Sequence, residues 1–147
     1  MKMNRQNGVT LLELLIVVAI IALISTFAYP SYTQYVVNSK RTAATSALLR
    51  VADRQQQFFM DNKAYANDLT ALGFGANPYV ITDDGSPSTV GDTRSVYSIS
   101  FSNVAATTYT ITAAPLHGQL SRDTKCGSLT LDQAGTRGSS TGDDDCW

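Results

Sequence analysis

The chain has 147 residues, with 11 Lys and Arg against 12 Asp and Glu and a formal net charge of -1. This length allows one modest hydrophobic core and excludes a two-domain enzyme. A single histidine, His117, and two cysteines leave too few residues for most metal-dependent or histidine-dependent catalysis. The near-neutral charge is not typical of a nucleic-acid coat protein or of an acidic disordered tail. We therefore expect one small domain that is not an enzyme.

An apolar run begins close to the N-terminus. Residues 11–30 contain only three polar side chains, Glu13, Ser25 and Thr26. As a helix these twenty residues reach about 30 Å, the thickness of the hydrocarbon core of a bilayer. The preceding segment carries Lys2 and Arg5 and no acidic residue, which keeps the N-terminus in the cytoplasm by the positive-inside rule. The pattern predicts a membrane span followed by an exported segment.

The helical pattern continues beyond this run. A cleaved secretory signal peptide is one interpretation of residues 1–30. Against it, apolar residues recur at steps of three and four further along, at Tyr32, Tyr35, Val36, Ala43, Ala47, Val51 and Phe58. We predict one helix from about Thr10 to about Met60, apolar all round in its first half and amphipathic in its second. Pro30 predicts a kink in this helix, although it could instead divide two helices.

Glu13 is unusual in its position. A carboxylate near the start of a membrane helix costs a few kcal/mol unless it has a partner, so such residues are candidates for function. The positive end of its own helix would also stabilise it, since acidic side chains are favourable in a first turn. Stabilisation by the helix end explains why a glutamate is tolerated at position 13, but not why it lies at this distance from the N-terminus.

The residues around Glu13 form a recognisable motif. Gly8, Val9, Thr10, Leu11, Leu12 and Glu13, between the basic segment and the apolar run, resemble the class III signal of type IV pilins and pseudopilins. The resemblance implies that an inner-membrane prepilin peptidase cuts between Gly8 and Val9 and methylates the amine of Val9. It also implies that Glu13 is retained in the filament. There it would neutralise the N-terminal ammonium of a neighbouring subunit, and a shift of one helical turn would leave both charges unpaired, so we interpret Glu13 as an assembly residue.

The second half of the chain has the pattern of a small antiparallel sheet. Residues 61–95 are rich in Gly, Pro and Asp and predict a long loop, a candidate surface for subunit contacts. Within 96–131, apolar and hydroxyl side chains alternate in three stretches, VYSISF, TTYTITAA and CGSLTL. We predict an α+β fold of the type IV pilin kind, with a long N-terminal helix whose amphipathic part, residues 31–60, packs on three to four strands.

Cys126 and Cys146 enclose a 21-residue segment at the C-terminal end. In an exported chain this pair should be oxidised. A redox pair or two free thiols are the alternatives, but the spacing is far from CxxC and favours a structural disulfide. The stretches YTITAAP and RDTKCGSLTLDQAGTRG, with the terminal Cys146 and Trp147, resemble minor type IVa pilins of the PilE kind. That resemblance implies a D-region bounded by the two cysteines, residues 126–146.

The acidic and basic residues give weaker signals. Three consecutive acids, Asp143, Asp144 and Asp145, are not spaced like a Ca²⁺ loop and read as a solvated charge run. The candidates for DNA contact are Lys40, Arg41, Arg50, Arg54, Arg94, Arg122, Lys125 and Arg137. The first four fall on the expected polar face of the helix, where basic residues are common in any protein. His117 follows Pro115 in an expected turn and should be exposed. We expect no metal and no cofactor.

Together the resemblances imply a leader in residues 1–8, a membrane and filament-core segment in 9–30 and a soluble pilin domain in 31–147. They imply a minor subunit of a type IV pilus that serves twitching motility, adhesion or DNA uptake. The alternatives are a pseudopilin of type II secretion, a major pilin and a pilus-borne DNA receptor. The implied partners are other pilins, the prepilin peptidase, the inner membrane before assembly and, with weaker support, DNA. The implied location is the inner membrane and then the surface pilus of a Gram-negative bacterium.

Overall fold

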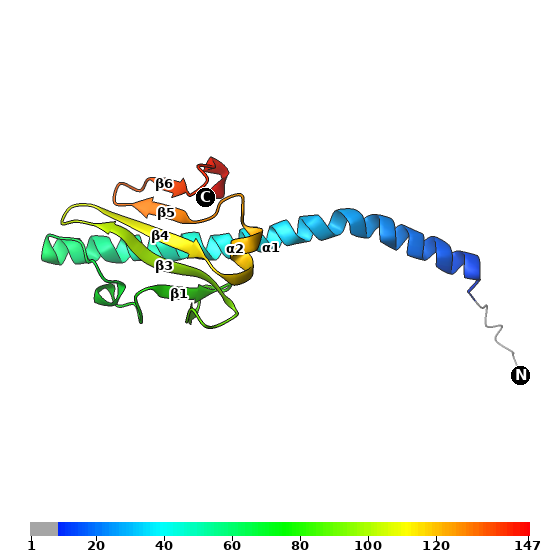
Figure 1. Ribbon diagram of the computed structural model, residues 1–147, viewed down its shortest axis with the longest axis horizontal. Coiled ribbons are helices and arrows are strands. Elements are labelled where there is room, and N and C mark those ends of the chain that lie inside the picture. Colours follow the sequence, from blue (N-terminus) through cyan, green and yellow to red (C-terminus); the bar gives the residue numbers. More distant parts are fainter. Residues whose placement is uncertain (1–8) are drawn as a thin grey trace, which may run out of the picture. The chain divides into compact units, whose positions relative to one another are not determined.

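The computed structural model describes residues 9–147 (Figure 1). A single helix, α1, runs from Leu11 to Asn62 and contains Pro30. This confirms the prediction of one helix and excludes a boundary at Pro30, where the ring removes one backbone donor without ending the helix. The kink at Pro30 stays a prediction. The leader residues Lys2, Arg5 and Gly8 lie outside the described residues.

The chain divides into two compact units, with the boundary between Val36 and Val37. In the described part of the first unit, residues 9–36, no side chain is buried, and apart from Val36 its large apolar side chains are about half exposed or more. One helix, α1, is long and apolar enough to cross a membrane, with a mean hydropathy of 2.7 in an 18-residue window of which none is buried. The hydrophobic core lies entirely in the second unit.

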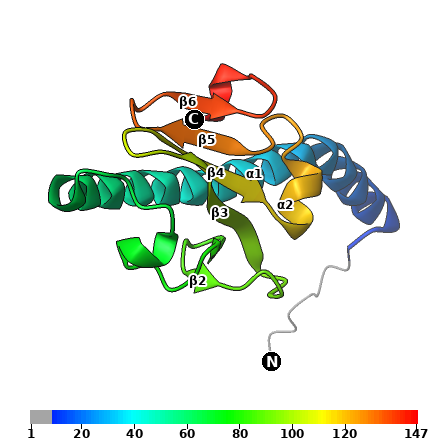
Figure 2. The same cartoon turned by 60° about the vertical axis from the view of Figure 1, so that its left-hand side comes forward.

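The second unit contains a six-stranded antiparallel sheet in the order β2-β1-β3-β4-β5-β6. The strands are β1 (Tyr79–Thr82), β2 (Pro87–Ser88), β3 (Ser95–Val104), β4 (Tyr109–Pro115), β5 (Leu129–Asp132) and β6 (Arg137–Ser139). The prediction of three to four strands was therefore too low. The three alternating stretches are β3, β4 and β5, whereas β1 is buried at all four positions and does not alternate, and β2 and β6 have only two and three residues. Figure 2 shows the short β2 at one edge and β6 at the other.

The core forms between α1 and one face of the sheet. Ala44, Ala47, Leu48 and Val51 are buried at helical spacing on α1, and the inward side chains of the strands pack against them. Those inward residues include Tyr97, Ile99, Tyr109, Ile111, Ala113, Leu129 and Leu131. The hydroxyl side chains between them point to the other face, as the two-residue period of a strand requires. The α+β fold of a helix packed on an antiparallel sheet is confirmed.

Residues 61–95 are more ordered than an ordinary loop. They contain a short 3-10 helix, η1 (Leu69–Leu72), which is capped by Asp68, and the strands β1 and β2. The side chain of Gln55 on α1 ties this segment down, because its amide donates to the carbonyl of Ala66 at 2.6 Å and accepts from the N–H of Ala66 at 2.9 Å. Gln55 is fully buried, so both of its polar atoms need such partners.

Candidate functional site

Glu13 lies in the first turn of α1. Its backbone N–H donates to the hydroxyl oxygen of Thr10 at 3.3 Å, and the spacing Thr-x-x-Glu is that of a capping box. Thr10 thus starts the helix by satisfying one of the backbone donors of the first turn. Val9, just before it, is 69% exposed. The local role of Glu13 at the helix start leaves its carboxylate available for a partner outside the chain.

The C-terminal segment is closed by a disulfide between Cys126 and Cys146, with the two Cα atoms 5.6 Å apart. Both cysteines are buried. Trp147 extends the closure, because its indole N–H donates to the carbonyl of Gly138 at 2.9 Å and the guanidinium of Arg137 lies 5.4 Å from its ring centre. The disulfide and the contacts of Trp147 therefore hold the C-terminal segment in place, although it has few apolar residues.

The acidic run lies beside a lysine. The ammonium of Lys125 is 3.4 Å from a carboxylate oxygen of Asp143 and 3.6 Å from one of Asp145. The side chain of Asp143 also accepts from the N–H of Asp145 and caps the 3-10 helix η2 (Asp144–Cys146). Within residues 9–147, no cluster of three or more His, Cys, Asp or Glu side chains is arranged to hold a metal ion.

A buried polar cluster joins α1, β3 and the short helix α2 (His117–Arg122). Arg41, one of the candidates for DNA contact, was expected on the polar face of the helix, and that position was wrong, since Arg41 is only 8% exposed. Its guanidinium binds Asp123 through two hydrogen bonds, from Nε to Oδ2 at 3.1 Å and from Nη2 to Oδ1 at 2.5 Å. The fork of arginine matches a carboxylate in this bidentate geometry. Arg41 therefore has a structural partner and is not free to contact a ligand.

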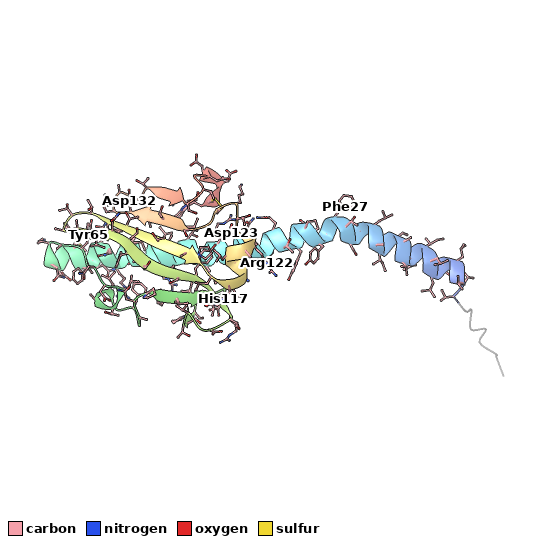
Figure 3. The ribbon with its side chains drawn as sticks, viewed as in Figure 1. Phe27, Tyr65, His117, Arg122, Asp123 and Asp132 are labelled. Carbon is pink, nitrogen blue, oxygen red and sulfur yellow. A yellow bond between two sulfur atoms is a disulfide. The ribbon has the colours of Figure 1, made fainter. Side chains whose placement is uncertain are left out.

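Asp123 is the centre of this cluster. The hydroxyl of Tyr97 on β3 donates to Asp123 Oδ2 at 2.9 Å, and the amide of Gln119 on α2 donates to the same atom at 3.2 Å. Gln119 also donates to the carbonyl of Val37 at 3.3 Å, which connects α2 with α1. The cluster fixes α2 in place (Figure 3, where Asp123 and Arg122 are labelled).

The same contacts decide the charge state of Asp123. Burial alone would raise the pKa of its carboxyl, but the hydrogen bonds from Arg41, Tyr97 and Gln119 outweigh burial, so this pKa lies below its usual value. Burial raises the pKa of the Tyr97 phenol. Asp123 is thus a buried carboxylate whose charge is balanced by Arg41.

A groove of about 500 Å³ lies beside this cluster, entirely within the second unit. One wall is the turn between β1 and β2 with the segment before β3 and the start of β3, and the other is α2 with Lys40 of α1. Its charged side chains are the basic residues Lys40, Arg94 and Arg122 and the acidic residues Asp83 and Asp84. Among the side chains that line it there is no Phe, Tyr or Trp. Such a groove can hold phosphate oxygens but offers no surface for base stacking.

The three basic residues of the groove differ in whether their side chains are paired with an acidic residue. Arg94 is paired with Asp92, with Nη2 and Oδ2 3.0 Å apart, and its hydrogen bonds lower the pKa of Asp92 to about 2. Arg122 is exposed, and Lys40 is half-buried. Neither Lys40 nor Arg122 is in an ion pair within residues 9–147. Lys40 and Arg122 are therefore the residues best placed to bind an anion.

The remaining basic candidates are not brought together at one site. Arg50 donates to the carbonyl of Gly85 at 3.4 Å, Lys125 pairs with the acidic run, and Arg137 covers Trp147. Arg54 lies exposed on α1, outside the groove. His117 is exposed as expected, but it begins α2, and its Nε2 lies 3.2 Å from the carbonyl oxygen of Val90.

Three residues of this region gave no signal in the sequence: Tyr97, Gln119 and Asp123. Tyr97 reads as an ordinary inward residue of a strand, and Asp123 lies 82 positions from Arg41. The one available hint was the position of Arg41 on α1, at helical spacing from Ala44 and Leu48. A charged side chain on that face is buried and therefore requires a partner elsewhere in the chain.

Comparison with known proteins agrees with this fold and with the N-terminal motif. A family model described as "Type IV minor pilin ComP, DNA uptake sequence receptor" matches residues 30–130, and one described as "Prokaryotic N-terminal methylation motif" matches residues 3–29. The fold and these matches define a filament subunit with an N-terminal helix of the methylated class. The chain belongs to the type IV pilin family.

Two curated relatives are similar over part of their length. The type IV major pilin protein PilA of Myxococcus xanthus is 34% identical over 70 residues, which cover 48% of this chain and 32% of the relative. The fimbrial protein EcpC of Eikenella corrodens is 32% identical over 71 residues, which cover 48% of this chain and 46% of the relative. The chain thus spans less than half the length of these two relatives. A solved structure of a type IV pilin from Shewanella oneidensis has a TM-score of 0.49 and 20% identity, over 76% of this chain and 97% of that chain.

Proposed function

We propose that this chain is a minor subunit of a type IV pilus and that its second unit binds DNA for uptake. The observation that carries the proposal is the match of residues 30–130 to a family described as minor pilins that receive DNA uptake sequences. The groove supports it, because Lys40 and Arg122 present two unpaired cations there on a chain of net negative charge. The family is one of structural subunits, and no catalytic step is proposed.

The proposed course of assembly starts in the membrane. The prepilin peptidase cuts between Gly8 and Val9, the apolar part of α1 holds the mature chain in the inner membrane of a Gram-negative bacterium, and other pilins then receive it into the surface filament. The filament would serve DNA uptake, with twitching motility and adhesion as further uses. The family and the N-terminal motif support assembly with other pilins and processing by the peptidase.

Two other roles receive less support. The names of the relatives favour a major pilin, since three of the matched relatives are called major pilins or a major pilus component. The match to a minor-pilin model over more than half of the chain outweighs that name. A type II secretion pseudopilin is disfavoured by the disulfide that closes the C-terminal segment.

Glu13 is the residue proposed to set the register of assembly. We expect Glu13→Ala to be processed normally but to enter filaments at least about tenfold less than the wild type, because it leaves an N-terminal ammonium without its counter-charge in the helix bundle. The measurement is the amount of this chain in sheared filaments relative to the amount in the membrane.

Glu13→Gln separates the charge of this side chain from its size. Glutamine has nearly the same shape but carries no charge, and the backbone N–H at position 13 can still donate to Thr10 in either variant. If the carboxylate charge matters, Glu13→Gln enters filaments as poorly as Glu13→Ala. Normal incorporation of Glu13→Gln would reduce Glu13 to a helix-start residue.

The groove is tested by removing its two unpaired cations. For the full chain in detergent we expect Lys40→Gln with Arg122→Gln to weaken binding of a labelled duplex, and to reduce the slope of log affinity against log salt by about 2, one for each lost phosphate contact. Fluorescence anisotropy between 50 and 200 mM salt measures both quantities.

The matched control moves the same charge change away from the groove. Arg54→Gln with Lys63→Gln removes two exposed cations of α1 and of the residues just after it, outside the groove. We expect this pair to keep the wild-type slope. Equal losses for both pairs would show a nonspecific effect of net charge and would contradict the groove assignment.

A further inference from the structure

The end of the apolar segment carries a stripe of exposed tyrosines. Tyr29, Tyr32 and Tyr35 are 74%, 66% and 72% exposed, although each has a large apolar ring. At 3.6 residues per turn, their spacing of three places them within about 120° of one face of α1. All three lie in the first unit, where no described side chain is buried, so the fold of the chain itself does not cover them.

The distance from the N-terminal motif to this stripe matches a bilayer. The twenty residue-to-residue steps from Val9 to Tyr29 rise about 30 Å, which is the thickness of the hydrocarbon core. No charged residue occurs between Glu13 and Lys40. When Val9 and Glu13 lie at one boundary of the hydrocarbon, the tyrosines therefore begin at the other boundary. Phe27, the last fully apolar ring before them, points away from the ribbon of α1 (Figure 3).

The chemistry of tyrosine fits that boundary. Its ring is apolar and its hydroxyl needs a polar partner, which is why Tyr is enriched where hydrocarbon meets lipid headgroups. A dry bundle of helices would cover the rings but leave the hydroxyls without donors or acceptors. Lipid phosphate and ester oxygens satisfy them.

We propose that Tyr29, Tyr32 and Tyr35 bind the headgroup region of the outer leaflet before assembly and so set the depth of α1 in the membrane. Anchored there, the helix holds Glu13 at the opposite boundary, where its carboxylate can reach water and is placed to pair with another subunit. The inference rests on the proposed residence in a membrane and does not depend on DNA binding.

Depth-dependent quenching tests this assignment on the full chain. Tyr32→Trp is reconstituted in vesicles of phosphatidylethanolamine and phosphatidylglycerol whose acyl chains carry bromine either near the headgroup or near the bilayer centre. Bromine quenches only an indole close to it. Because the new tryptophan should lie at the headgroup boundary, we expect shallow bromine to quench it about twofold more than deep bromine. Trp147, the one natural tryptophan, lies in the second unit and gives the background from the unchanged chain.

Ile20→Trp is the matched control, because residue 20 lies near the middle of the expected span. We expect deep bromine to quench it more than shallow bromine. If neither bromine quenches Ile20→Trp, membrane residence itself fails, and with it that part of the proposed function. If Ile20→Trp behaves as expected but Tyr32→Trp is quenched most by deep bromine or not at all, the interface assignment is overturned. If quenching of Tyr32→Trp by shallow bromine falls as the protein-to-lipid ratio rises, a second copy of the chain covers the stripe instead of lipid.

Discussion

Arg41→Ala is expected to lower the free energy of unfolding of the second unit by about 3–5 kcal/mol, because it leaves the buried carboxylate of Asp123 without its cation. The side chain of Asp123 is inaccessible, so water cannot replace the guanidinium. The remaining donors, Tyr97 and Gln119, are neutral and do not balance the charge. Urea unfolding of the full chain in detergent, followed by the fluorescence of Trp147, measures the loss.

Two comparisons make this result specific. Arg122→Ala removes an exposed arginine one residue from Asp123 and should change stability by no more than about 0.5 kcal/mol. The pKa of Asp123 is lowered in the folded chain, so its contribution is complete above the ordinary aspartate pKa of about 3.9 and is lost as the pH falls through the folded value. The difference between Arg41→Ala and the wild type should therefore shrink as the pH falls. A loss below about 1 kcal/mol at neutral pH would mean that the pair is not closed in solution.

The second large effect is expected from the disulfide. Replacing Cys126 and Cys146 by serine should lower the free energy of unfolding by about 3 kcal/mol, the chain-entropy value for a loop of this length. The segment inside the loop contains β5, the three-residue β6 and the 3-10 helix η2, and of these β5 is the one that pairs with a strand outside the loop. Thermal unfolding of the double variant measures the effect.

Reduction of the unchanged chain is the control for that substitution. Dithiothreitol should shift the wild-type midpoint to that of the serine variant and leave the variant unchanged. Equal midpoints for the oxidised chain and the variant would show that α1 and the sheet alone determine stability. Because Trp147 follows Cys146, its fluorescence should also report release of the C-terminal segment before the core unfolds.

The parts of the fold that could be predicted are those whose pattern is local. The helix was predicted to within a few residues, because apolar side chains recur at helical spacing on both sides of Pro30. The strands β3, β4 and β5 were found because apolar side chains, which face the core, alternate along them with hydroxyl side chains, which face away from it. β1 was missed because its four residues are all buried, and a short apolar run does not distinguish a strand from other buried segments.

The groove and its supporting cluster could not be predicted in the same way. Arg41 and Asp123 are 82 positions apart, and nothing in the residues around either one indicates the other. The motif around Glu13, in contrast, is contiguous, and the match of residues 3–29 to an N-terminal methylation motif agrees with it. Local sequence thus indicates the family, whereas the groove and the cluster beside it depend on residues that only the folded chain brings together.

The most direct test of the account is the N-terminus of the chain recovered from sheared filaments. Mass spectrometry of the N-terminal peptide should find methylated Val9, so that the apolar helix and Glu13 remain in the exported subunit. Recovery of a chain that begins near residue 29, or its absence from filaments, would contradict the central claim that this helix joins the subunits of a pilus.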